Sequence, residues 1–314
     1  MFLLKAWRAS LFGAHGYFNY TQSGFREHSK SFKQEEMISR MEGKNCVVTG
    51  ANSGIGYAAA EGLAARGATV YIVCRSKEKG EAAVSEIRSK SNNQNVHLES
   101  VTSKLWLQDF PHQLCLFTFW SIMLAFLRTK SSSQQKEMNF AVNGLGTFCV
   151  TELLMPLMKK AAPEARVITV SSGGMYSTTL NNDLQFTEGE FDGIEQYARN
   201  KRLQVALTEK WAEIHKGEGV SFYSMHPGWV RTPGVTKSLP EFNEKFSTML
   251  RTREEGADTI IWLALQPNEK LSSGRFYFDR KEARKDLLFS GTRIFHANID
   301  PIYDKLRSMI TNLL

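Results

Sequence analysis

The stretch Cys46–Gly56 reads CVVTGANSGIG, an apolar run that leads into three closely spaced glycines. An alanine-rich stretch with helical character follows, so the order of elements is strand, tight turn and helix. In such a turn Gly50 makes the bend, Gly54 lets the backbone approach a pyrophosphate, and Gly56 lets the helix pack closely on the sheet. The helix N-terminus would then face phosphate groups. Three glycines alone are a weak signal, but their place between a strand and a helix strengthens it.

Strand-like and helix-like segments alternate along the rest of the chain. The expected strands are 45–49, 69–74, 95–99, 166–171, 220–225 and 275–278. The expected helices are 57–66, 77–89, 140–160, 197–216 and 254–265. Because strands that alternate with helices form parallel sheets, we predict an α/β fold: a single Rossmann-type doubly wound parallel sheet with helices on both faces.

The length and composition of the chain suit one large domain with tails. A chain of 314 residues, 42% of them hydrophobic, can bury one core, which we place at residues 41–280. Residues 281–314 form a C-terminal tail and residues 1–40 an N-terminal extension with no acidic residue before Glu27. The basic and apolar composition of the extension is compatible with three alternatives: an organelle transit peptide, an amphipathic helix on a membrane surface, or a helix packed on the domain.

The cysteine and charge patterns restrict the cellular compartment of the protein and the kinds of partner that it binds. The four cysteines show neither CxxC nor metal-ligand spacing, and they are Cys46, Cys74, Cys115 and Cys149. We therefore expect reduced thiols, no metal site and an intracellular protein, cytoplasmic unless the extension directs it to an organelle or a membrane. The net charge of +7 is spread along the chain, which favours a polyanionic cofactor over nucleic acid as the partner. A homo-oligomer is left open.

The end of the second strand bears on the choice of cofactor. An NAD-preferring site would place an acidic residue there to bind the ribose 2′-hydroxyl. This chain has Arg75, followed by Lys77, and both can meet a 2′-phosphate. We predict that NADP(H) is favoured over NAD(H). The alternative is that both are solvated cations at the start of a helix.

Three further residues suggest proton transfer. Tyr197 and Lys201 lie one helical turn apart on the same face of a predicted helix. A tyrosine hydroxyl titrates near pH 10 unaided, so it needs a nearby positive charge to exchange protons at neutral pH. Ser172 follows a predicted strand at the edge where open α/β sheets bind ligands, and its hydroxyl can bind a substrate oxygen. Taken alone, each of these is more often an incidental surface or turn residue.

Together these motifs resemble the short-chain dehydrogenase/reductase family, whose TGxxxGIG, NxxG, Ser and YxxxK elements occur in order between about residues 43 and 280. The resemblance implies that Tyr197 is the catalytic acid/base, that Lys201 lowers its pKa and holds the nicotinamide ribose, and that Ser172 orients the substrate. It also implies that Asn143 completes a proton relay. The segment HPGWVRT at 226–232 resembles the family's loop that holds the nicotinamide carboxamide. The candidate cofactor-binding residues are Thr49, Gly50, Asn52, Ser53, Gly54, Ile55, Gly56, Arg75, Lys77, Pro227, Gly228 and Thr232.

One segment departs from the family pattern. The family has an aspartate just after the third strand and Asn-Asn-Ala-Gly at the end of the fourth, and neither occurs in residues 100–136. Leu116–Leu127 can be encoded by codons that, when read in a shifted frame, encode VHVLVNNAGFL. That peptide contains the missing strand and the missing motif. We infer an aberrant splice form or a faulty gene model whose frame recovers near Glu137. Leu116–Ile122 holds acceptable strand residues and can still enter the vacant position, without an asparagine beside the cofactor.

These observations predict an NADP(H)-dependent oxidoreductase that transfers hydride between the cofactor and a small lipophilic carbonyl or alcohol. A nucleotide-sugar epimerase shares the Tyr and Lys pair but usually has a TGxxGxxG motif, and the spacing of Gly50, Gly54 and Gly56 fits the reductases. The non-enzyme alternative is a catalytically impaired or inactive form without the Asn-Asn-Ala-Gly strand, which serves at most as a binding module.

Overall fold

A computed structural model describes residues 2–100, 119–122, 138–187, 190–292 and 299–311. Within these ranges the strands form one eight-stranded sheet in the order β3-β2-β1-β4-β5-β6-β7-β8. All pairs are parallel except β7 with β8. The strands are β1 (Asn45–Thr49), β2 (Thr69–Cys74), β3 (Val96–Ser100), β4 (Phe119–Ile122), β5 (Ala165–Val170), β6 (Val220–His226), β7 (Arg275–Phe278) and β8 (Lys281–Glu282).

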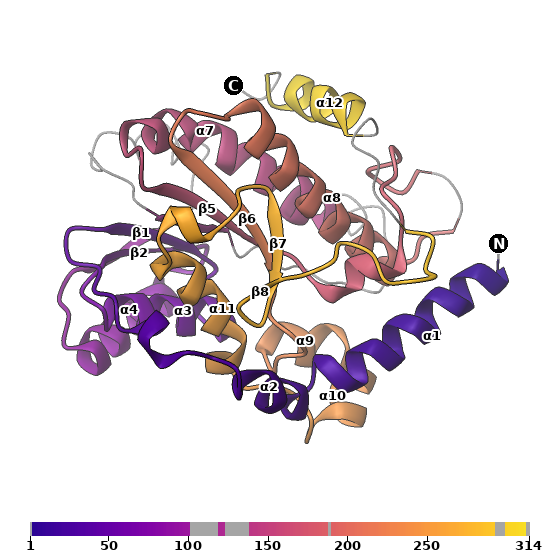
Figure 1. Cartoon of the computed structure of the whole chain (residues 1–314), viewed down its shortest axis with the longest axis horizontal. Coiled ribbons are helices and arrows are strands. Elements are labelled where there is room, and N and C mark those ends of the chain that lie inside the picture. Colours follow the sequence, from indigo (N-terminus) through magenta and orange to yellow (C-terminus); the bar gives the residue numbers. More distant parts are fainter. Residues whose placement is uncertain (1, 101–118, 123–137, 188–189, 293–298, 312–314) are drawn as a thin grey trace.

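Helices cover both faces of the sheet (Figure 1). One apolar core lies between the sheet and α3 (Gly54–Ala64), α4 (Lys77–Ser91) and α11 (Arg253–Leu265). The second core lies on the other face, beneath α7 (Gly146–Lys160), α8 (Gly193–Ile214) and α12 (Asp300–Thr311). Successive strand residues alternate between the two cores, as Val47 and Val48 do, because side chains of a strand point to opposite faces. The predicted doubly wound sheet is confirmed.

Strand β4 lies at the centre of the sheet and is shorter than its neighbours β1 and β5. Its residues pair with β1 from Cys46 to Val48 and with β5 from Val167 to Thr169, three pairs on each side. The neighbouring β5 and β6 make six pairs and β1 and β2 make five. Part of the stretch expected to enter this position therefore does so. The rest of segment 100–136 after Ser100 lies outside the described residues.

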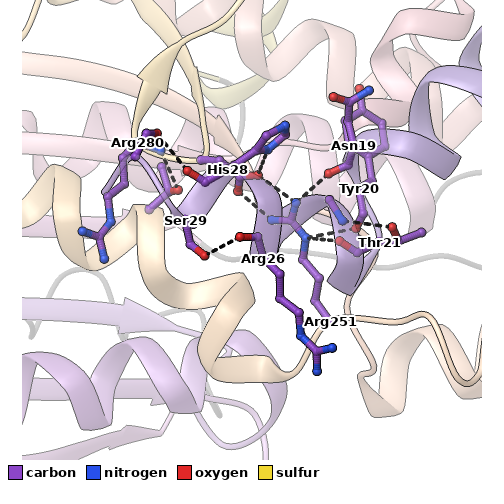
Figure 2. A network of polar contacts seen from close by, with 12 residues as sticks. Asn19, Tyr20, Thr21, Arg26, His28, Ser29, Arg251 and Arg280 are labelled. Atoms are coloured by element: carbon purple, nitrogen blue, oxygen red, sulfur yellow. Dashed lines mark hydrogen bonds and ion pairs between the residues drawn. The ribbon is translucent and has the colours of Figure 1, made fainter. Parts of the chain in front are cut away.

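The N-terminal extension packs on the domain, which is the third of the alternatives left open by its composition. It forms α1 (Phe2–Asn19), α2 (Gln22–Ser29) and a short 3-10 turn, η1 (Gln34–Met37). Figure 2 shows how the guanidinium of Arg251 reaches three successive carbonyl groups where α1 ends. Tyr20 lies in this turn and is 1% exposed. The side chain of Tyr20 thus belongs to the interior of the protein.

Shorter helices complete the description. Two lie between β6 and α11, next to the end of α1 in Figure 1: α9 (Pro233–Ser238) and α10 (Pro240–Phe246). A π-helix, η3 (Ala141–Leu145), leads into α7, and two 3-10 turns are η4 (Gly173–Ser177) and η5 (Asn268–Lys270). Among the described residues, one helical run, Met138–Lys160, is long and apolar enough to cross a membrane, and half of its most apolar window is buried within the molecule.

Candidate active site

The glycine turn after β1 has the conformation that a phosphate cradle requires. Gly50 and Gly54 have φ angles of +67° and +59°, in the left-handed region that favours glycine. A Cβ atom on Gly56 would lie 2.7 Å from the carbonyl oxygen of Gly50, so only glycine lets α3 begin this close to the turn. Ser53 precedes α3 and its side chain caps no backbone N–H of the first turn. The first-turn N–H groups of α3 therefore suit a pyrophosphate.

The remaining predicted residues of this turn differ in how far they are buried. Thr49 is buried at the end of β1, whereas Asn52 and Ile55 are half-buried and Ser53 is exposed. A Cβ atom on Gly54 would lie 3.3 Å from Cγ2 of Thr232, so the loop after β6 faces the glycine turn directly. The structure thus brings the two predicted halves of the cofactor site together.

The side chain of Arg251 packs against the backbone of the loop after β6. Gly228 has a φ of +84°, and a Cβ atom there would lie 2.3 Å from Nε of Arg251, so the arginine packs directly on the loop backbone. Nη1 of Arg251 also donates to the carbonyl oxygen of Pro227 at 3.4 Å. Thr232 accepts a hydrogen bond from the backbone N–H of Val235 at 3.2 Å and so caps α9. Both ends of the loop are therefore fixed.

The two predicted phosphate-binding cations, like the glycine turn, lie at the carboxyl edge of the parallel sheet. Arg75 directly follows β2 and is exposed. Lys77 is the first residue of α4, also exposed, and 3.8 Å from Glu81 in a loose surface ion pair. No acidic residue stands between β2 and the start of α4. The position expected for the adenine-facing aspartate lies outside the described residues.

The catalytic candidates meet where β5 ends beside α8. A Cβ atom on Gly174 would lie 3.5 Å from Oγ of Ser172 and 3.9 Å from Cε1 of Tyr197, and the two side chains share a hydrogen bond. Nζ of Lys201 lies 5.5 Å from the centre of the Tyr197 ring. Oγ of Ser171 donates to the carbonyl oxygen of Lys201 at 2.8 Å and ties α8 to the end of β5. The predicted Ser, Tyr and Lys are thus brought together.

Burial shifts both titratable groups toward their neutral forms. It raises the pKa of Tyr197 to about 12, although the hydrogen bond with Ser172 acts in the lowering direction. Burial also lowers the pKa of Lys201 to about 7. The resemblance to the family implies that Lys201 lowers the pKa of Tyr197. The residues of the chain do not by themselves bring the pKa of this phenol near neutral pH, because desolvation outweighs the hydrogen bond with Ser172.

Asn143 lies in the π-helix η3, where the helical ladder is locally widened. Its side-chain Nδ2 donates to the carbonyl oxygen of Asn139 at 3.1 Å and to Oδ1 of Asn139 at 2.8 Å. Its backbone oxygen faces α8 and accepts from Nε2 of Gln204 at 2.9 Å. Asn143 is therefore buried next to the catalytic helix, and its carbonyl group is the part directed toward it.

Several supporting residues were not found by sequence reasoning. Nδ1 of His226 accepts the backbone N–H of Gly173 at 2.9 Å and so holds the turn that carries Ser172. The ring of Tyr20 packs edge-on against His226 with centroids 4.3 Å apart. The HPG motif marked the position of His226 without a role. Arg251 and Tyr20 carried no signal, because their contact joins segments about 230 residues apart.

Comparison with known proteins agrees with this geometry. A sequence model of the family described as "short chain dehydrogenase" matches residues 44–104. Dehydrogenase/reductase SDR family member 12 of Bos taurus is 38% identical over 96% of this chain and 98% of the relative. Retinol dehydrogenase 11 of Homo sapiens is 32% identical over 76% of this chain and 78% of the relative.

Solved structures show the same fold. A short-chain dehydrogenase from Escherichia coli CFT073 complexed with NADPH superimposes with a TM-score of 0.64 at 19% identity. The match covers 78% of this chain and 99% of the other. At this identity the likeness speaks for the fold alone, whereas the similarity to the bovine relative speaks for the family. The chain belongs to the short-chain dehydrogenase/reductase family of nicotinamide-dependent oxidoreductases.

Proposed function

We propose that the chain is built for an NADP(H)-dependent reaction in which hydride passes between the cofactor and a lipophilic carbonyl or alcohol. The single observation that carries this proposal is the pairing of the Ser172 and Tyr197 side chains through a hydrogen bond at the end of β5, with Lys201 one turn away. A substrate oxygen placed there can accept hydrogen bonds from both hydroxyl groups. Such donors stabilise the charge that develops on the oxygen during the reaction.

The protein residues would move the proton. In the reductive direction, the phenol of Tyr197 gives its proton to the substrate oxygen, and Ser172 holds that oxygen by a hydrogen bond. Lys201 stabilises the resulting phenolate through its positive charge. The nicotinamide, when bound, supplies or takes the hydride. The glycine turn and the first turn of α3 would hold the pyrophosphate, while Pro227, Gly228 and Thr232 would line the nicotinamide end.

The preference for NADP(H) rests on Arg75 and Lys77. Both are exposed at the end of β2 and the start of α4, where a ribose 2′-phosphate would lie, and no acidic residue stands between β2 and α4. The ion pair of Lys77 with Glu81 is loose, at 3.8 Å. A charged donor forms stronger hydrogen bonds with a phosphate than with a hydroxyl group. The NADPH-bound structural neighbour is consistent with this preference.

A lipophilic substrate is supported by the aromatic side chains that follow Gly228. The ring of Trp229 lies 5.1 Å from Phe242 and 5.0 Å from Phe246 on α10. This cluster adjoins the loop that would hold the nicotinamide. The name of the retinol dehydrogenase relative points to the same class of substrate. The test is NADPH oxidation with a panel of apolar aldehydes and ketones against polar sugars, and turnover of the polar set alone would contradict the proposal.

Contact with a membrane surface is proposed for the exposed side of α1. Apolar side chains gather there and on the adjoining C-terminal loop: Leu4, Trp7, Leu288 and Phe289 are 47%, 51%, 58% and 83% exposed. Nε1 of Trp7 donates to the carbonyl oxygen of Phe289 at 3.1 Å and joins the two parts. An intracellular protein with such a patch can rest on a bilayer. Sedimentation with vesicles, compared between the wild type and a Trp7→Ser and Phe289→Ser double variant, tests this contact.

The catalytically impaired form remains the second candidate, and two observations favour it. The match to the family's sequence model ends at residue 104, just inside segment 100–136. Strand β4 makes only three pairs with each neighbour at the centre of the sheet. We propose that this segment is out of frame. Sequencing the transcript across codons 95–140 decides the matter, because an in-frame Asn-Asn-Ala-Gly in the main transcript would make this chain a minor or faulty form.

A further inference from the structure

We infer that Gln204 is a positioning residue of the active site, whose side-chain amide links the ammonium group of Lys201 to the backbone carbonyl of Asn143. Gln204 lies on α8, three residues after Lys201, and its side chain has no exposed surface. The catalytic consequence of this link rests on the proposed function. The link itself is a matter of geometry.

The amide of Gln204 is bound at both ends. Nζ of Lys201 donates to Oε1 of Gln204 at 3.1 Å. Nε2 of Gln204 donates to the carbonyl oxygen of Asn143 at 2.9 Å and to Oγ1 of Thr147 at 3.0 Å. An ammonium group can only donate and a carbonyl group can only accept, so the amide cannot be turned round. Its oxygen must face Lys201 and its nitrogen must face Asn143.

The amide oxygen stabilises the charged form of Lys201. Nζ of Lys201 also donates to the carbonyl oxygen of Val170 at 2.8 Å. In the part of the chain that the structure describes, the titratable groups facing this ammonium are Tyr197 on α8 and His226 on β6. Neither carries a negative charge at neutral pH, since burial raises the pKa of Tyr197 and lowers that of His226. Neutral acceptors, Gln204 among them, therefore oppose the desolvation of Lys201.

The same link fixes where the ammonium group lies. Lys201 has a flexible side chain, and its ammonium group is bound by the carbonyl oxygen of Val170 on β5 and by Gln204 on its own helix. Gln204 is in turn held by the π-helix through Asn143 and by α7 through Thr147. Amide groups are not titratable at neutral pH, so Gln204 positions Lys201 and does not itself carry the proton.

The experiment measures the pKa of Lys201 directly, so it needs no turnover. Protein labelled with ¹³C at the ε carbon of lysine is titrated by NMR, and the Lys201 signal is assigned by its loss in Lys201→Met. Gln204→Leu should lower the pKa of Lys201 by about one to two pH units, which is the loss of one charge-assisted hydrogen bond. Gln204→Glu should raise it, because a carboxylate would face the ammonium.

The matched control is Gln196→Leu, which removes another buried amide from α8 whose partners are Leu184 and Asn200. It should leave the pKa of Lys201 unchanged. An unchanged pKa in Gln204→Leu or Gln204→Glu would overturn the inference, as would an equal change in the control. If Gln204→Leu fails to fold, the near-isosteric Gln204→Glu still decides the question through its opposite sign.

Turnover separates this inference from the proposed function. If the wild type reduces carbonyls, the pH profile of kcat should move in the same direction as the pKa of Lys201 in each variant. If the wild type shows no turnover while the pKa of Lys201 shifts as expected, the proposed function fails and the link stands. If turnover occurs and neither variant moves the pKa, the proposed function stands and the role of Gln204 is refuted.

Discussion

The substitution Asp279→Asn tests how firmly the N-terminal extension is built into the domain. Asp279 holds Arg251 through two hydrogen bonds, of 2.6 and 2.8 Å, and the two side chains are 4% and 0% exposed. Arg251 in turn reaches the carbonyl oxygens of Asn19 at 2.8 Å and of Tyr20 at 3.0 Å. Asparagine keeps the shape of this carboxyl group and removes its charge. The variant therefore leaves a buried guanidinium without its counter-ion.

Removing one partner of a buried ion pair costs about 3–5 kcal/mol, because the remaining charge stays desolvated. For a chain of this size about 1 kcal/mol corresponds to roughly 2 °C in Tm, so we expect Asp279→Asn to melt about 6–10 °C lower. The control is Glu282→Gln, which breaks a surface pair with Arg275 at 3.6 Å in which both side chains are 52% exposed. That change should cost at most about 1 kcal/mol.

The stability that Asp279 contributes should depend on pH in a defined direction. Burial raises the pKa of Asp279, but the hydrogen bonds from His28 and Arg251 outweigh it and hold the pKa below its usual value. A carboxyl group with a lowered pKa adds stability above its unfolded pKa, near 4, and that stability is lost as the pH falls through the folded pKa. The difference in Tm between the wild type and Asp279→Asn should therefore be full at pH 7 and shrink in acid.

The assay is thermal melting followed by circular dichroism at a series of pH values, with NADPH binding measured in parallel. Because Arg251 packs on the loop of Pro227 and Gly228, the variant should also bind NADPH more weakly. A Tm within about 2 °C of the wild type at pH 7, or a loss no larger than that of Glu282→Gln, would show that the pair contributes little and that the extension is not anchored as described.

Three further outcomes are expected. In a version of the chain that carries the shifted-frame strand, Tyr197→Phe should abolish carbonyl reduction and leave NADPH binding nearly intact, because only the proton-bearing hydroxyl is lost. Steady-state turnover and fluorescence titration measure the two, and full turnover in the variant would refute the mechanism. Arg75→Ala should raise the Kd for NADPH far more than for NADH, and equal losses would make Arg75 an ordinary surface residue. A version of the chain with the shifted-frame strand in place of segment 100–136 should melt at a higher temperature than the chain as given, and NADPH should stabilise it more. The reason is that each unpaired buried backbone group costs about 1–3 kcal/mol. Equal melting temperatures of the two proteins, both with and without NADPH, would contradict this.

Local sequence patterns determined the glycine turn, the spacing of the catalytic candidates and most of the strands. The glycine spacing after Cys46–Thr49 predicts a turn with positive φ angles, and Gly50 and Gly54 have them. The spacing of Tyr197 and Lys201 places them on one face of α8, because residues four apart meet in a helix. Six strands were predicted to within one residue at each end, whereas β8 was not predicted, and Phe119–Ile122 is the described part of the stretch expected at the centre. All of these depend on neighbours within a few residues, so the sequence carries them directly.

The tertiary structure alone decided how distant segments meet. The composition of residues 1–40 left three alternatives, and the contact of Arg251 with Tyr20, which joins opposite parts of the chain, shows that the extension packs on the domain. The role of Gln204 depends on Lys201, Asn143 and the π-helix lying on adjacent elements. The raised pKa of Tyr197 likewise follows from burial, which spacing does not specify. These features arise where side chains from remote elements exclude water together, and that enclosure is a property of the packed fold.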